Sequence, residues 1–228
     1  RALFERTGRK VQWAEKYTSL CYPSKYPCSE EKEYMILFQL DYPEKVTEYE
    51  REGSYDKAAA LCYERWKNCP FDLPKLVAAG AQMWYTSYLI DVNEGDPHPM
   101  TASFPEQDVL LAWLQEITLY GFSKFPDATE FNVIFGYMAR TLPDQFLGAD
   151  YLWWYNKGNA MIQKAYHDAP ENLIAKAMYY RSDEEIYRAV CSEIWESVTP
   201  SQWGDSEVQR YFFRIMNGRR KYPDAYED

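Results

Sequence analysis

Carboxylate clusters are the groups in this chain whose type and spacing suit catalysis. They comprise Glu30 with Glu31, Glu106 with Asp108, and the run Asp183, Glu184 and Glu185. Two carboxyl groups of unequal pKa serve as acid and base in glycoside hydrolases. The second and third clusters, however, each follow a helix-start signal, where acidic side chains complement the helix dipole. We interpret those two clusters as ordinary helix N-terminal acids.

Other catalytic and metal-binding motifs are missing from the sequence. It contains no GxSxG nucleophile elbow, no GxxxxGK[ST] phosphate loop and no HExxH zinc motif. The two histidines, His98 and His167, are far apart, and no CxxC pair is present, so we expect no structural zinc site. We interpret each histidine as an ordinary loop or helix-end residue rather than a general base.

The cysteines leave the redox state of the chain open. Cys21 and Cys28 flank two prolines in a loop-like stretch and could form a disulfide if the protein is exported. Cys62 and Cys69 have the same spacing but share a helical pattern, in which seven residues span about 10.5 Å of rise. Since a disulfide needs Cα atoms within roughly 7 Å, we predict that Cys62 and Cys69 do not pair with each other.

The charge of the chain favours a basic protein partner. The 228 residues include 25 Lys and Arg against 35 Asp and Glu, a formal net charge of −10 at pH 7. Nucleic-acid binding needs a basic face, so we predict none. No apolar run approaches the length of a transmembrane helix. Because the sequence starts at Arg1 rather than at a methionine, a signal peptide or other leader could have been removed before it. We favour the cytoplasm, with the periplasm or secretion as alternatives.

Helix and turn signals alternate along the chain. Apolar residues recur at three- to four-residue spacing between Gly, Pro and Ser breakers, and no run alternates long enough to predict a strand. The predicted helices cover residues 30–52 (kinked near 41–43), 55–68, 73–92, 105–124, 129–141, 149–168, 171–181, 183–198 and 206–220. We therefore predict an all-α protein, with residues 1–29 as an N-terminal extension containing a Pro/Cys loop. Residues 30–228 form one helical domain, with a possible insertion loop at 93–104.

One segment resembles a known repeat family. Gly53, Tyr55 two residues later, Ala58 and the helix-ending Pro70 match the recurring positions in the second helix of a tetratricopeptide repeat. In that family the small residues let two helices approach closely, and the proline ends the second helix so that the next pair begins. The resemblance implies helix-turn-helix repeats stacked as a short α-solenoid.

Two further segments match the repeat less well. They end at Pro126 and Pro170, so the successive prolines from Pro70 onward lie 56 and 44 residues apart, compared with roughly 34 in the family. In the segment ending at Pro170, Trp153 stands where the glycine would be and Gly158 where the alanine would be. We therefore describe the array as diverged and tetratricopeptide-like.

Clustered aromatic residues indicate a binding surface. Trp84 stands beside Tyr85 and near Tyr88, and residues 151–155 read YLWWY. Neighbours on a helix lie about 100° apart, so adjacent rings cannot all face one core seam. In a solenoid the remaining rings would line the concave side, where Trp and Tyr anchor partners. We predict partner-binding rings at Trp84, Tyr88, Trp154 and Tyr155, with Trp154 as the chosen exposed anchor; a diverged core filled by these rings is the alternative.

A row of acids indicates a second binding surface. Glu44, Glu48 and Glu52 are four residues apart, so they form a like-charge stripe on one helix face. Each such pair opposes the helix by about 0.2–0.5 kcal/mol, a cost that a charged docking face would explain. We predict that these three residues bind the partner, with an ordinary solvated helix face as the alternative.

Three functions fit these features. The first is a non-catalytic module that binds a basic protein through an acidic and aromatic surface; toxin-neutralising bacterial immunity proteins are similar in size and charge only. The second is a carboxylate-based hydrolase acting on a carbohydrate-like ligand in an aromatic cleft. The third is a scaffold subunit of a larger assembly. We favour the first, with no enzyme activity, cofactor or metal, and leave the oligomeric state open.

Overall fold

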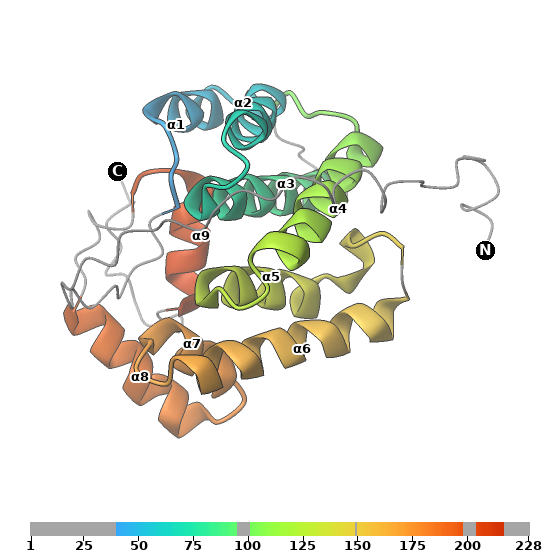
Figure 1. The fold of residues 1–228 in the computed structure, drawn as a ribbon. Coiled ribbons are helices and arrows are strands. Elements are labelled where there is room, and N and C mark those ends of the chain that lie inside the picture. The colour runs from blue at the N-terminus through green and yellow to red at the C-terminus, as the bar shows by residue number, and fades with distance from the viewer. Residues whose placement is uncertain (1–39, 95–100, 149, 198–203, 217–228) are drawn as a thin grey trace. The chain divides into compact units, whose positions relative to one another are not determined.

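Helices make up the computed structural model throughout the residues it describes, 40–94, 101–148, 150–197 and 204–216 (Figure 1). They are α1 (Glu44–Arg51), α2 (Tyr55–Asn68), α3 (Leu73–Glu94), α4 (Gln107–Lys124), α5 (Thr129–Thr141), the 3-10 turn η1 (Pro143–Gln145), α6 (Tyr151–Asp168), α7 (Leu173–Tyr179), α8 (Glu184–Ser197) and α9 (Glu207–Met216). Within these ranges there is no β-strand, and the structure has only an isolated β-bridge between Ser54 and Ser103. The all-α prediction is therefore confirmed.

The helix boundaries follow the breakers in the sequence. α2 and α5 cover the predicted residues, and α3 runs two residues further than expected, to Glu94. α7 is shorter than the predicted range 171–181 at both ends, because it begins after the Asn172 N-cap and ends at Tyr179. α1 begins at Glu44, after Pro43, whose backbone is extended at the N-cap. Proline disfavours a helical conformation in the residue before it, here Tyr42, so the helix does not extend further back. The predicted boundary at residue 30, the pair Glu30 and Glu31, Cys21, Cys28 and His98 lie outside the described residues.

Consecutive helices pack on one another: α1 on α2, α2 on α3, α3 on α4, α5 on α6, α6 on α7 and α7 on α8. Alternate helices also contact one another, α3 on α5 and α5 on α7. α9 comes back against α3 and α7 and runs across the direction of α3 in Figure 1. The C-terminal helix therefore covers part of the row that α3, α5 and α7 form.

The α5–α6 pair approaches most closely at two glycines. A Cβ atom added at Gly158 would lie 2.6 Å from the Gly136 carbonyl oxygen and 2.7 Å from the backbone nitrogen of Arg140. In α2, Ala58 is fully buried, as the repeat resemblance implied. A small residue is thus buried in each of these two helices, Ala58 in α2 and Gly158 in α6.

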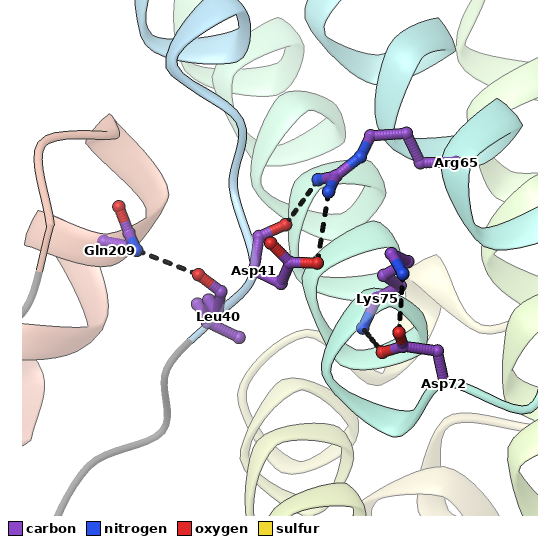
Figure 2. Close-up of polar contacts among 6 residues, drawn as sticks. All are labelled: Leu40, Asp41, Arg65, Asp72, Lys75 and Gln209. Carbon is purple, nitrogen blue, oxygen red and sulfur yellow. Dashed lines mark hydrogen bonds and ion pairs between the residues drawn. The ribbon is translucent and has the colours of Figure 1, made fainter. Parts of the chain in front are cut away.

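The segment that leads into α1 is held from two sides (Figure 2). Gln209 of α9 donates from Nε2 to the Leu40 carbonyl at 3.0 Å. On the other side, the Arg65 guanidinium of α2 donates to the Asp41 carbonyl at 2.7 Å and pairs with its carboxylate at 3.1 Å. These bonds tie the start of α1 to both α2 and the C-terminal helix.

The cysteine prediction is confirmed where it falls on described residues. Cys62 is buried and Cys69 is exposed, and neither forms a disulfide. Burial raises the pKa of the Cys62 thiol far above its ordinary value. A thiol that stays protonated is a poor nucleophile, so Cys62 acts as a small apolar core residue.

Candidate functional site

Trp84 belongs to the core rather than to an exposed binding surface. Its side chain is completely buried, and its ring lies 5.6 Å from that of Tyr211 and 6.2 Å from that of Phe212. Both of those rings come from α9, which covers the face of α3 that we expected to be open. The prediction of an accessible Trp84 is therefore wrong, because α9 of the same chain packs over it. Tyr88, one turn further along α3, is half-buried in the same cluster.

Trp154 is also buried, which corrects the choice of this ring as the exposed anchor. It is 5% exposed, and its ring centroid lies 4.8 Å from that of Phe146 and 6.3 Å from that of Phe122. The buried residues of α6 are Trp154, Gly158, Met161, Ile162 and Ala165. This three- and four-residue spacing is present in the sequence, and it is the signal that would have placed Trp154 inside.

Four neighbours of Trp154 in the first turns of α6 are exposed apolar residues, and we call this group the α6 ring patch. It consists of Tyr151, Leu152, Trp153 and Tyr155, which are 56%, 66%, 48% and 40% exposed. Asp150 fixes this end of the helix, because its carboxylate accepts a hydrogen bond from the Trp153 backbone N–H at 2.7 Å. Tyr155 is thus exposed as predicted, whereas the prediction omitted the other three residues.

The acidic stripe lies on α1 and its C-cap. Glu44 and Glu52 are exposed and Glu48 is half-buried. Lys45 reduces the charge of the stripe, since its Nζ lies 2.6 Å from the Glu48 carboxylate. The stripe and the α6 ring patch are separate surfaces, because α1 packs on α2 whereas α6 packs on α5 and α7; Figure 1 shows α1 far from the first turn of α6.

A buried carboxyl, Glu50, joins α1 to the start of α9. Its side chain is 3% exposed, and Oε2 accepts a hydrogen bond from the Glu207 backbone N–H at 2.8 Å. Glu207 in turn accepts from the Tyr55 hydroxyl at 2.8 Å. Two buried oxygens nearby, Glu50 Oε1 and Gln82 Oε1, have no hydrogen-bond partner. Sequence reasoning missed this cluster because Glu50 and Glu207 are 157 residues apart.

Burial raises the pKa of Glu50 to about 7, and the Glu207 carboxylate acts in the same direction, whereas the backbone hydrogen bond from Glu207 lowers it. Because the folded pKa lies above the ordinary value of 4.5, protonation favours the folded state. This contribution is complete below about pH 4.5 and is lost as the pH rises through about 7.

We therefore expect the free energy of unfolding to fall by on the order of 1 kcal/mol between about pH 6 and pH 8. Urea unfolding followed by circular dichroism measures this difference. Glu50→Gln should remove most of it, since the amide is neutral at both pH values. An equal pH dependence in the variant would place the titrating group elsewhere.

The remaining candidates for acid–base chemistry have structural roles or stand alone. Asp183 caps α8, because its carboxylate accepts from the Ile186 backbone N–H at 3.2 Å; this confirms its interpretation as a helix N-terminal acid. His167 is exposed at the end of α6, beside the rings of Tyr166 and Tyr179. Among the described residues, no group of three or more His, Cys, Asp or Glu could hold a metal ion.

No helix in the described ranges is long and apolar enough to cross a membrane. No protein-family model, curated protein or solved structure matches the chain. The tetratricopeptide-like resemblance therefore still depends on the residues that suggested it.

Proposed function

We propose that this chain is a non-catalytic protein-binding module whose main contact surface is the α6 ring patch. The observation that carries the proposal is the exposure of Tyr151, Leu152, Trp153 and Tyr155, 40–66% each, within five residues of one helix. Contiguous exposed apolar side chains mark interaction sites. Tyr and Trp are also the residues that most often dominate binding energy at protein interfaces.

The proposed partner is a basic protein. The net charge of −10 attracts a basic molecule over distance, and the acidic stripe Glu44, Glu48 and Glu52 presents part of that charge at the surface. Charges at such sites chiefly raise the association rate, whereas buried rings slow dissociation. A toxin neutralised by an acidic immunity protein is one partner of this kind.

We further propose that the paired helices are a diverged tetratricopeptide-like array. Three features support this: α3, α5 and α7 contact one another in order, Ala58 is fully buried, and Gly53 has a positive φ of 68° in the turn before α2. Gly158 allows the close α5–α6 approach at the position where the family has alanine. In such an array α9 would occupy part of the concave side.

Affinity capture from the source organism tests the binding function. The tagged chain should retain one stoichiometric basic protein, and the double variant Tyr151→Ser/Trp153→Ser should lose it. Asn156→Ser, an exposed change on the same helix, is the matched control and should retain the partner. Equal capture by all three proteins would reject the α6 ring patch as the contact surface.

The acidic stripe makes a separate kinetic prediction. Replacing Glu44, Glu48 and Glu52 by Gln should leave the fold intact, because all three lie at or near the surface, and should slow association with the captured partner. The loss should shrink as salt is raised, since charges are screened over about 8 Å at physiological ionic strength. Stopped-flow or surface-plasmon measurements give both rates. Unchanged association at low salt would make the stripe an ordinary solvated face.

The hydrolase alternative has one supporting observation, the raised pKa of Glu50 beside Glu207. Against it, Glu50 is 3% exposed and its Oε2 is engaged by the α9 backbone, so a substrate could reach it only after α9 moves. Thermal stabilisation by an oligosaccharide, absent in Glu50→Gln, would favour the hydrolase. Capture of several partners in fixed ratio would instead favour the scaffold subunit.

A further inference from the structure

Two arginines cross the contact between α5 and α7: Arg140 of α5 reaches Met178 of α7, and Arg181, which follows α7, reaches Tyr137 of α5. The Arg140 guanidinium donates a hydrogen bond from Nη1 to the Met178 carbonyl of α7 at 3.5 Å. Arg181 follows α7, and its guanidinium carbon lies 5.2 Å from the centroid of the Tyr137 ring. Both side chains are half-buried. Burial lowers the pKa of Arg140, and the positive charge of Arg181 lowers it further.

Neither arginine forms an ion pair with a carboxylate in the described part of the chain. The ion pairs there include Arg65 with Asp41 and Arg188 with Glu184, but none with Arg140 or Arg181. This is unexpected in a protein with ten more acids than bases, because partly buried like charges repel and lose hydration. The charge of these two side chains is therefore not neutralised by a direct contact with any described acid.

Tyrosine side chains lie beside the two arginines. Tyr137 and Tyr211 share a hydrogen bond between their hydroxyls at 2.9 Å, and the Tyr187 hydroxyl donates to the Ile215 carbonyl. Burial raises the pKa of Tyr187 to about 12, and burial raises that of Tyr211 as well. Tyr187 and Tyr211 therefore stay uncharged near neutral pH and do not balance the arginines.

We propose that Arg140 and Arg181 bind an oxyanion, the phosphate or carboxylate group of a ligand. Guanidinium groups offer several fixed N–H donors that suit the paired oxygens of either group. The bound anion would remove the repulsion between the two cations. This site is distinct from the acidic stripe and does not depend on the proposed binding of a basic protein.

The experiment titrates the full chain with inorganic phosphate in one arm and acetate in the other, each against sodium chloride at equal ionic strength. Thermal unfolding and the NMR signals of the arginine Nε–H groups report binding. We expect a saturable rise in melting temperature with an apparent Kd at or below about 1 mM, together with shifts of the Arg140 and Arg181 signals. A response to phosphate alone identifies a phosphate site; a response to acetate of equal strength identifies carboxylate recognition.

Arg140→Gln and Arg181→Gln should each weaken the anion response at least about tenfold, the loss of roughly one charge-assisted contact. Arg188→Gln is the matched control, since Arg188 is exposed and already paired with Glu184, and it should respond like the parent. Without anion, Arg140→Gln should melt no lower than the parent because repulsion is relieved. Phosphate and acetate effects no larger than that of sodium chloride, with unmoved arginine signals, would overturn the proposal.

Discussion

Trp154→Ala should cost the protein about 3–5 kcal/mol of stability, the range found when a buried Trp or Phe is truncated in a core. Trp154 is 5% exposed and its ring packs against those of Phe122 and Phe146, so the deletion leaves a cavity among α4, α6 and the segment before α6. Its Nε1 has no hydrogen-bond partner, so the loss is one of packing. Denaturant unfolding followed by circular dichroism measures it.

Trp153→Ala is the matched control, because it removes the same side chain one position earlier. Trp153 is 48% exposed, and its ring packs edge-on against that of Trp154 at a centroid distance of 4.7 Å. We expect about 0.5–1.5 kcal/mol for that contact, and a faster dissociation of the partner. If the two variants lost similar stability, the assignment of Trp154 to the core and Trp153 to the surface would be wrong.

Gly158→Ala should destabilise the protein by on the order of 3 kcal/mol, the upper part of the range for overpacking. Alanine favours a helix by about 1 kcal/mol over glycine, so propensity alone predicts the opposite sign. The new Cβ, however, would lie 2.6 Å from the Gly136 carbonyl oxygen and 2.7 Å from the Arg140 nitrogen. Backbone atoms cannot rotate away, so α5 and α6 must separate.

Asn156→Ala provides the comparison for this change. Asn156 is exposed on the same helix, so the substitution gains helix propensity with no clash and should leave the melting temperature unchanged or slightly higher. A Gly158→Ala protein that melts like Asn156→Ala would contradict the close α5–α6 crossing.

Local patterns were enough to predict the helices. Gly53, Pro70 and Pro126 stop or start them by backbone geometry alone, which explains why α2 and α5 match their predicted ranges. The burial of Ala58 followed from its place in the repeat pattern. Both inferences need only residues that are near one another in the sequence.

The surfaces could not be predicted in the same way, because they depend on contacts between distant segments. Rings of α9 help to cover Trp84, and nothing in α3 specifies that Tyr211 will pack against it. The Glu50–Glu207 contact likewise joins residues 157 positions apart. Trp154 differs, because the three- and four-residue spacing from Trp154 to Ala165 defines the buried face of α6. Applying that spacing to the sequence would have predicted that Trp154 is buried.

Hydrogen–deuterium exchange of the chain, free and bound to its captured partner, tests the α6 ring patch most directly. The first amides of a helix have no intrahelical acceptor and exchange fast unless covered, so the start of α6 is a sensitive reporter. We predict that binding slows exchange in peptides covering Tyr151–Lys157, with little change in α4 or α8. Unchanged exchange at Tyr151–Lys157, with protection confined to another part of the chain, would contradict the proposal that the α6 ring patch is the contact surface.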